Sequence, residues 1–374
     1  MTIYLLVFAG ALVLAVGATP LARFLGPRVG VIDQPESRKI HARPVPRLGG
    51  AAILVAVLLV SVIVGERHNF DQFGSILVGA AGISFIGLID DRWGLPPLVK
   101  LVGQIAAALL LYVSGVYVSA FPHPSLNVVA TVFWVVYITN AINLLDNMDG
   151  LAGGVAAIAA AHFALMCAFS GQYLVGALSI ALLGACLGFL FYNVNPASIF
   201  MGDSGSLFLG FVLAATGIKL RFPDNVTFVT WMVPVLVMGI PVFDTALVII
   251  SRLRRGMNPL TNPGQDHVSH RLVAAGMGRR EAVLMLYIGS FVLGLLAIFV
   301  TQASIVEGYI GGGVAALVGL FALWRMERPP FYSSQETSAV ALAEDERSLA
   351  GHQATTGQIA VADATARTAL RDDA

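Results

Sequence analysis

Long apolar runs alternate with short polar loops along this chain, and this alternation constrains the fold more than any other feature. A helix that crosses a bilayer needs about 20 mostly apolar residues, and on that criterion we predict about eleven transmembrane helices. They cover about residues 3–26, 48–65, 74–89, 98–118, 126–145, 150–170, 172–192, 204–220, 226–251, 281–301 and 305–325. The predicted fold class is therefore an all-α integral membrane protein.

The composition agrees with a membrane protein. Of the 374 residues, 57% are hydrophobic and only 12% are charged, and the mean hydropathy is +0.81. A soluble domain averages about 25% charged residues. The formal net charge of zero gives no reason to expect a nucleic-acid partner. The first apolar run lacks a preceding basic segment, so we expect an uncleaved helix there and not a signal peptide.

The distribution of charge predicts the orientation in the membrane. In the predicted order, the loops after the first, third, fifth, seventh and ninth spans share one side, and these loops hold most of the acidic and histidine residues. The same loops carry most of the basic residues, including Arg28, Arg38, Lys39, Arg43, Arg47, Arg252, Arg254, Arg255, Arg271, Arg279 and Arg280. Because Lys and Arg collect on the cytoplasmic side, we expect the motif-bearing face to be cytoplasmic and the N-terminus to lie outside.

The apolar pattern stops after Pro329-Pro330. The segment beyond is rich in Ala, Ser, Thr and acidic residues, a composition typical of disordered chain. We expect a polytopic membrane transferase domain over residues 1–326 and a disordered cytoplasmic tail over residues 327–374.

Two adjacent carboxylates, Asp90 and Asp91, directly follow an apolar run. Adjacent carboxylates at a helix end repel each other unless a cation or a shared proton relieves them. A hydrated Mg²⁺ suits this position because it favours hard oxygen ligands and phosphate oxygens. For this pair alone, a solvated helix end is the structural alternative.

Amide and carboxylate side chains recur every third residue at Asn140, Asn143, Asp146 and Asp149. At this spacing they fall along one side of a helical turn, where they could bind a metal, a sugar or a nucleoside. Helix capping could explain one of them but not four. Asp203 stands beside glycines at the start of the next apolar run, so it could cap that helix or serve a metal–phosphate site.

Two loops supply the opposite charge, through Arg38, Lys39, His41, His267, His270 and Arg271. Cationic side chains suit a diphosphate and a lipid phosphate, although ordinary positive-inside topology could also explain them. The paired histidines lack a third soft ligand nearby, which favours phosphate contact over zinc. Asp244, inside the ninth predicted span, could reach the site or pair with an internal polar partner.

With these residues assembled, the chain resembles the polyprenyl-phosphate N-acetylhexosamine-1-phosphate transferases of glycosyltransferase family 4. That family includes enzymes that start O-antigen and wall teichoic acid synthesis and, more distantly, phospho-MurNAc-pentapeptide translocase. The resemblance runs from about residue 27 to 280. It rests on Arg38-Lys39-x-His41, Pro46-Arg47-x-Gly49-Gly50, Asp90-Asp91, Asn140-Ala-x-Asn143-x-x-Asp146-x-x-Asp149-Gly150-Leu151, Phe200-Met-Gly-Asp203-x-Gly205-Ser206 and His267-x-x-His270-Arg271-Leu272.

The last motif is closer to the teichoic-acid initiating enzymes than to the translocase, but the chain departs from their pattern at two positions. Ser269 stands where those enzymes often have a histidine. Asn147 stands where a glycine is common between the two aspartates. Any role of the replaced histidine is therefore in doubt for this chain.

The resemblance implies transfer of a sugar-1-phosphate, with GlcNAc-1-phosphate expected, from a UDP-sugar to undecaprenyl phosphate, releasing UMP. This would be the first membrane step of a cell-envelope glycan. The resemblance also implies Mg²⁺, with Mn²⁺ able to substitute, held by Asp203 and Asn143. Asp90 or Asp91 would deprotonate or position the lipid phosphate for direct attack; double displacement through an aspartyl-phosphate is the alternative. The remaining substrate-binding residues would be Arg38, Lys39, His41, Asn140, Asp146, Asp149, His267, His270 and Arg271.

Further expectations are a multi-pass protein of the bacterial plasma membrane, a cytoplasmic catalytic cleft and a homodimer. Within the enzyme class, the donor could instead be another UDP-N-acetylhexosamine or UDP-MurNAc-pentapeptide. From another class, the alternative is a polytopic transporter. Transporters place charges at mid-membrane within inverted repeats, whereas here the acids gather at one face and no repeat is visible.

Overall fold

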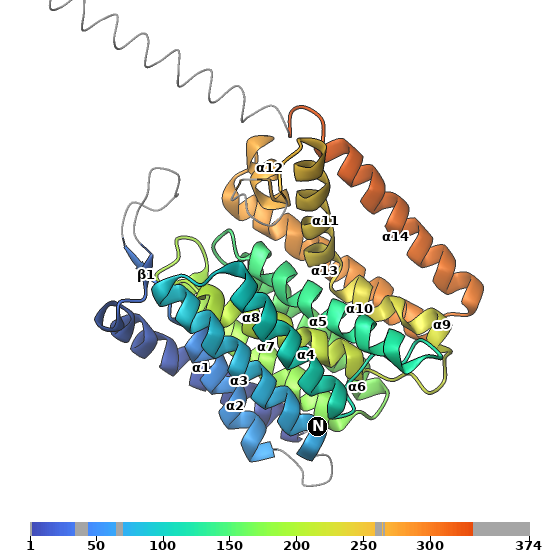
Figure 1. Ribbon diagram of the computed structural model, residues 1–374, viewed down its shortest axis with the longest axis horizontal. Helices are drawn as coiled ribbons and strands as arrows, with labels where there is room; N and C mark the ends of the chain where they lie inside the picture. Colours follow the sequence, from blue (N-terminus) through green and yellow to red (C-terminus); the bar gives the residue numbers. More distant parts are fainter. Residues whose placement is uncertain (1, 34–43, 65–69, 259–263, 265, 332–374) are drawn as a thin grey trace, which may run out of the picture.

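The computed structural model describes residues 2–33, 44–64, 70–258, 264 and 266–331, which are almost entirely helical (Figure 1). The long helices are α1 (Thr2–Val29), α2 (Gly49–Val64), α3 (Phe70–Trp93), α4 (Pro97–Val113), α5 (Pro124–Leu145), α6 (Leu151–Phe169), α7 (Tyr173–Asn193), α8 (Gly202–Lys219), α11 (Gly239–Arg254), α13 (Arg279–Gln302) and α14 (Ile305–Met326). The short helices are α9 (Thr227–Thr230), α10 (Met232–Val237) and α12 (Val268–Ala274). The predicted all-α class is confirmed, apart from one antiparallel pair of two-residue strands, β1 (Ile32–Asp33) and β2 (Val45–Pro46).

The helices lie where the apolar runs predicted them, but the described residues hold fewer full-length spans than expected. By length and composition, seven helices can cross a membrane, or up to eight if one bent pair counts as a single span. α2 and α4 are apolar but shorter. The prediction of about eleven complete spans is therefore replaced by seven or eight, accompanied by shorter apolar helices. The multi-pass membrane class is confirmed.

The ninth predicted span is broken and not continuous. Its two parts, Thr227–Val237 and Gly239–Arg254, meet at 75°. Pro241 lies just after the break, and a proline cannot donate to the carbonyl four residues earlier, which here belongs to Val237. The break changes the direction of α11, the helix that carries Asp244.

α8 is the central helix of the bundle. Every residue from Ser204 to Ile218 is buried, because α8 packs against α2, α3, α5, α6 and α7. A helix that is apolar all round has no face for solvent, so it fits this enclosed position. Its N-terminus, which carries Asp203, points toward the end of the bundle where the polar loops gather.

The polar loops converge at one end of the bundle, as the order of the spans predicted. Backbone hydrogen bonds join β2 and the start of α2 to the segment before α8: Phe200 N donates to Pro46 O (2.8 Å), and Gly50 N donates to Met201 O (2.8 Å). In Figure 1, β1 and the upper ends of α3, α5 and α8 lie at this end, while α11, α12 and part of α13 rise beyond it. The site described below is built here.

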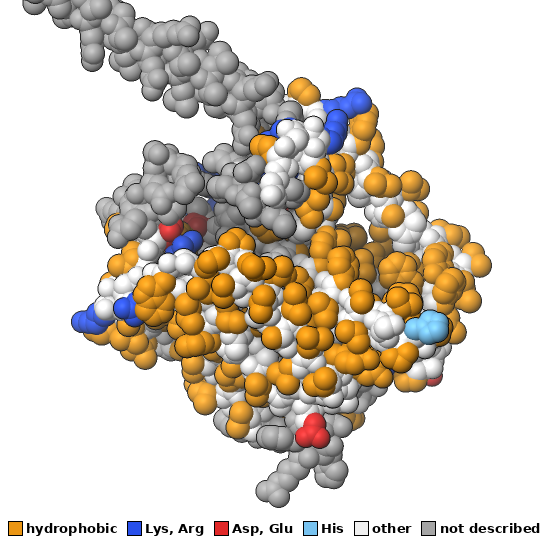
Figure 2. Space-filling model, viewed as in Figure 1, with side chains coloured by type: hydrophobic (Ala, Val, Ile, Leu, Met, Phe, Trp, Pro, Cys, Tyr) orange, Lys and Arg blue, Asp and Glu red, His pale blue; other side chains and the backbone are white. Residues whose placement is uncertain are grey.

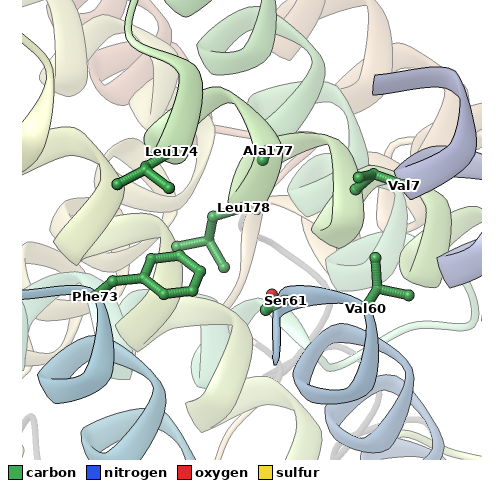
Figure 3. A pocket seen from close by; sticks show the side chains of 7 residues that line it. All are labelled: Val7, Val60, Ser61, Phe73, Leu174, Ala177 and Leu178. Atoms are coloured by element: carbon green, nitrogen blue, oxygen red, sulfur yellow. The ribbon is translucent and has the colours of Figure 1, made fainter. Parts of the chain in front are cut away.

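The surface agrees with a membrane setting. Figure 2 shows hydrophobic side chains covering the flank of the bundle, with Lys, Arg, Asp and Glu largely confined to its ends. Exposed apolar side chains occur all along α14, of which Gly308 is the only buried residue. A small cavity near the far end is lined by apolar side chains and Ser61 (Figure 3). Its lining holds no charged group, so it offers no chemistry comparable to that of the polar end.

Residues just after the boundary predicted at residues 326 and 327 contact the helical bundle. The Glu327 carboxylate forms ion pairs with Arg254 (3.4 Å) and Arg271 (2.9 Å). Phe331 packs against buried apolar residues. The described contacts therefore continue to residue 331, and the domain boundary itself stays a prediction. The rest of the predicted tail, residues 332–374, lies outside the described residues.

Candidate active site

One lysine joins two of the predicted site carboxylates. Nζ of Lys100, one turn into α4, lies 2.8 Å from Asp90 Oδ2 and 2.9 Å from Asp203 Oδ2. Asp90 Oδ1 also accepts a hydrogen bond from the backbone N–H of Leu95 at 2.6 Å. Three helices, α3, α4 and α8, thus bring one cation and two anions together at the polar end of the bundle.

Asp91 has a different role from its neighbour Asp90. Its two carboxylate oxygens accept hydrogen bonds from the backbone N–H groups of Asp203 (2.9 Å) and Ser204 (3.0 Å). These are among the N–H groups that a helix N-terminus leaves without intrahelical partners. Gly202 precedes them with a φ of 71°, and a Cβ there would lie 2.5 Å from Asp91 Oδ2. Asp91 therefore caps α8 from outside that helix, whereas Asp90 contacts Lys100, and the catalytic role expected of either stays a prediction.

A close helix crossing sets the distance between α3 and α8. A Cβ on Gly87 would lie 2.5 Å from the carbonyl carbon and oxygen of Asp203. Only glycine permits this approach without a shift of one backbone. Because Gly87 lies less than one turn before Asp90, this crossing fixes how near the two carboxylates stand.

The two asparagines of α5 face different partners. Asn143 Nδ2 donates to Asp203 Oδ1 (3.1 Å) and to the Ser206 hydroxyl (2.9 Å), so this side chain belongs to the Asp203 cluster. Asn140, one turn earlier, exchanges hydrogen bonds with the side-chain amide of Gln104 on α4, at 2.6 and 3.3 Å. The structure therefore brings Asn143 to the site and places Asn140 in a link between α4 and α5.

Asp146 and Asp149 lie in the turn between α5 and α6. Burial, and then the negative charge of Asp203, raise the pKa of Asp146 to about 7. Asp149 Oδ2 accepts hydrogen bonds from Asn195 Nδ2 (2.9 Å) and the Ala197 N–H (3.0 Å), which anchors the loop before α8. Asp146 is thus coupled to the site electrostatically, whereas Asp149 organises an adjoining loop.

The histidine motif opens the short helix α12. Asp244 is fully buried in α11, where its Oδ2 lies 2.8 Å from His267 Nδ1 and its Oδ1 accepts the Val268 N–H at 2.7 Å. The internal-partner alternative for Asp244 therefore holds, and that partner is a motif histidine. Burial, and then the neighbouring His267, lower the pKa of His270 to about 4. A His270 ring with this pKa is mainly neutral near pH 7, and its expected contact with substrate stays a prediction.

Arg271 makes several contacts inside the protein. Its side chain is 3% exposed, and it donates to Asp266 O (2.9 Å), Met326 O (2.7 Å) and the Ser251 hydroxyl (2.7 Å). It also pairs with Glu327, as described above. Three hydrogen bonds and one ion pair thus hold the guanidinium inside the protein. Arg271 therefore joins α12 to α11 and α14, and its expected phosphate contact stays a prediction.

Comparison with known proteins identifies the family. Residues 73–221 match Glycosyl transferase family 4. The chain is 36% identical over 296 residues to a probable undecaprenyl-phosphate N-acetylglucosaminyl 1-phosphate transferase of Bacillus subtilis, covering 77% of this chain and 82% of the relative. The chain belongs to glycosyl transferase family 4.

Other relatives place the chain among the transferases of this family. A decaprenyl-phosphate N-acetylglucosaminephosphotransferase of Mycolicibacterium smegmatis is 36% identical over 310 residues, covering 72% of this chain and 75% of the relative. A phospho-N-acetylmuramoyl-pentapeptide-transferase of Staphylococcus carnosus is 28% identical over 279 residues, covering 68% and 84%. The chain is therefore a membrane-bound transferase, and the predicted resemblance is confirmed.

Sequence reasoning missed Lys100, although a signal was present. It is the only charged residue in the apolar helix α4. A charged side chain within a membrane helix marks a functional site by default, so this position could have been singled out. Three predicted family-motif residues, Arg38, Lys39 and His41, lie outside the described residues. Arg47, from the next motif, pairs with Asp33 across the hairpin at 3.5 Å.

Proposed function

We propose that this transferase moves a sugar-1-phosphate, in the form of N-acetylglucosamine-1-phosphate, from a UDP-sugar to undecaprenyl phosphate and releases UMP. The observation that carries the proposal is the cluster of Asp90, Lys100, Asn143 and Asp203 at one end of the bundle. The names of the two relatives that are 36% identical support N-acetylglucosamine as the transferred sugar. We place the reaction at the cytoplasmic face of the bacterial plasma membrane, because the basic loops lie at this end.

The residues of the cluster fit a divalent cation. Asp203 and Asn143 would hold Mg²⁺, with Mn²⁺ as a substitute, and Asp90 lies beside them. The described residues contain no group of three or more His, Cys, Asp or Glu arranged for a metal. Mg²⁺ does not need one, because it is commonly bound by one or two carboxylates together with substrate phosphates. The Lys100 ammonium already lies within 2.9 Å of both carboxylates, so the position accepts positive charge. When bound, the ion neutralises the donor diphosphate and the departing UMP.

Asp90 is the carboxylate that acts on the acceptor, because both oxygens of Asp91 already bind the start of α8. Asp90 positions the lipid phosphate and takes its remaining proton, a modest demand because that group's second ionisation lies near 6. An oxygen of the lipid phosphate then attacks the sugar-linked phosphorus of the donor. A new P–O bond forms to the attacked phosphorus. The bond between that phosphorus and the oxygen that bridges the two donor phosphates breaks, and its electron pair leaves with UMP. Double displacement through an aspartyl-phosphate is the competing route.

His267 contacts the donor phosphates through its Nε2 atom. Asp244 holds the other ring nitrogen, and a carboxylate in that position fixes ring orientation and tautomer. His270, which is neutral, contributes a hydrogen bond and not a charge. Asp146 lines the donor side, at the turn after Asn143. The expected homodimer stays a prediction.

The test is UMP release by the purified full-length protein in nanodiscs with undecaprenyl phosphate, Mg²⁺ and UDP-GlcNAc. We expect release that depends on lipid and metal, stops with EDTA and is lost in Asp203→Asn. UDP-MurNAc-pentapeptide and a UDP-N-acetylgalactosamine donor serve as rivals. UMP from a rival alone would keep the reaction class and replace the donor. No UMP with any donor, from folded protein, would overturn the proposal.

The route is tested separately by omitting the acceptor. Direct attack predicts that UDP-GlcNAc labelled in its sugar-linked phosphate leaves no acid-stable or acid-labile label on the protein. A covalent label that disappears in Asp90→Asn would establish the aspartyl-phosphate route instead.

A further inference from the structure

The ammonium of Lys100 occupies the position between the Asp90 and Asp203 carboxylates, where a cation that both share would bind. Its ammonium contacts Oδ2 of each carboxylate at 2.8 and 2.9 Å, from a helix that carries no other charge. The remaining Asp203 oxygen, Oδ1, receives the Asn143 amide. One side chain thus supplies the positive charge that two nearby carboxylates need.

A divalent ion and this ammonium cannot share the same carboxylate oxygens. Mg²⁺ binds its oxygen ligands at about 2.0–2.1 Å and requires nearly octahedral geometry. An ammonium bonded to the same Asp203 Oδ2 atom would face the metal at short range, with repulsion between like charges. The metal and Lys100 are therefore alternatives at that oxygen.

The side chain of Lys100 can vacate the position without a change of fold. A lysine carries its charge on a flexible four-carbon stem, so the ammonium can swing while α4 stays in place. Lys100 is only half-buried, whereas Asp91, which fixes the start of α8, is held by two backbone N–H groups. The rigid parts of the cluster thus stay formed while its cation is exchanged.

Resting on the metal-dependent transfer described above, we infer that Lys100 is a built-in counter-cation that competes with the divalent ion. It holds Asp90 and Asp203 together before metal binds, and metal binding displaces it from Asp203. The apparent affinity for the divalent ion is accordingly lower than the carboxylates alone would give, and the metal site is kept assembled between turnovers.

The experiment measures metal binding without substrates. Purified full-length protein in detergent is titrated with Mn²⁺, and free Mn²⁺ is followed by electron paramagnetic resonance. We expect Lys100→Met to bind Mn²⁺ about tenfold more tightly than the unchanged protein, because the competing charge is gone. Lys100→Arg, which keeps the cation, is expected to bind no more tightly than the unchanged protein. The matched control is Lys219→Met, since Lys219 is a half-buried lysine at the far end of α8, bonded to Gln72 at 2.6 Å, and its loss should change nothing.

A second measurement needs no variant, in case Lys100→Met does not fold. Acylation of each lysine in the unchanged protein is quantified by mass spectrometry with and without Mn²⁺. Displacement predicts that Mn²⁺ speeds the labelling of Lys100 several-fold and leaves Lys219 unchanged.

The outcomes separate the two proposals. If Lys100→Met binds Mn²⁺ equally or more weakly, or if Lys100 labelling ignores Mn²⁺, the competition is wrong while the transferase proposal stands. If the unchanged protein binds no Mn²⁺ in the absence of substrates, the inference fails. The metal part of the proposed function, in which substrate phosphates complete the site, is tested separately by the metal dependence of UMP release.

Discussion

The hydroxyl of Ser269 donates a hydrogen bond to Oδ1 of Asn147 at 2.6 Å, which joins α12 to the turn after α5. Ser269 is fully buried, and Asn147 in turn donates to the Leu144 carbonyl at 2.8 Å. These are the two positions at which the sequence departs from its family's pattern. Their contact ties the helix that begins at the histidine motif to the turn that carries Asp146.

Substitutions of Ser269 and Asn147 are expected to have non-additive effects in a double-mutant cycle. Ser269→Ala and Asn147→Ala should each lower kcat/KM for the UDP-sugar about fivefold, the kinetic equivalent of about 1 kcal/mol for one hydrogen bond. The double variant should be no worse than either single one, because both remove the same interaction. The cycle is measured by UMP release. Ser290→Ala, which removes a buried hydroxyl without a hydrogen-bond partner among the described residues, is the control. Additive losses would show that the two side chains act independently.

Substitution of Asp91 is expected to lower stability, whereas substitution of Asp90 is expected to lower activity. Asp91→Ala removes the cap of α8 and should lower the free energy of unfolding by about 1–2 kcal/mol. Asp90→Ala should lower kcat about 100-fold or more, as expected for loss of a general base, with a smaller change in stability. Thermal unfolding and UMP release distinguish the two. Asp91→Asn, which keeps one acceptor oxygen, should recover part of the lost stability. An Asp91→Ala protein with unchanged unfolding but no activity would contradict the capping role.

A methyl group on Gly87 should disturb the site through the helix crossing. It would meet the Asp203 backbone at 2.5 Å, so Gly87→Ala should cost about 1–3 kcal/mol and separate Asp90 from Asp203. The expected results are a lower unfolding midpoint and weaker Mn²⁺ binding. Gly82→Ala is the matched control, because its Cβ would meet nothing within 4 Å in the same helix. It should be neutral or slightly stabilising, by about 0.5–1 kcal/mol. Equal behaviour of the two variants would rule out the crossing as the cause.

Acid should weaken the α11–α12 region through Asp266. Burial alone would raise the pKa of Asp266, but hydrogen bonds from Arg255 and Arg252 outweigh it and hold the pKa below its usual value. The folded state therefore binds this proton less readily than the unfolded state. The stabilisation that Asp266 contributes is present at pH values above its pKa in the unfolded state, which is near 4. It is lost as the pH falls through the lower pKa that Asp266 has in the folded state.

The measurement is the thermal midpoint between pH 6 and pH 3. Asp266→Asn should cost about 2 kcal/mol near neutral pH and should flatten the loss of stability in acid. Asp224→Asn changes an exposed carboxylate and should leave the slope as it is. If the Asp266→Asn slope matches that of the unchanged protein, the acid sensitivity arises elsewhere.

The apolar runs alone determined the membrane class, the positions of the helices and the end at which the polar loops meet. These follow from local composition, because an apolar run of spanning length has one stable course through lipid and the order of runs fixes which loops share a side. The motif residues Asp203 and Asn143 were likewise identified from spacing and resemblance, and they lie together. The number of complete spans and the break before α11 were not foreseen, because Pro234 and Pro241 interrupt a run whose hydropathy is continuous.

Only the tertiary structure decided which polar side chain does what. Asp90 and Asp91 are adjacent in sequence, yet one contacts Lys100 and the other caps α8, a division that depends on how α3 meets α8 at Gly87. Arg271 belongs to a site motif but points into buried acceptors, since burial of a guanidinium requires that its donors be satisfied. Such assignments depend on contacts between residues far apart in the chain, as between Lys100 and Asp203 or Asn147 and Ser269, and local sequence does not contain them.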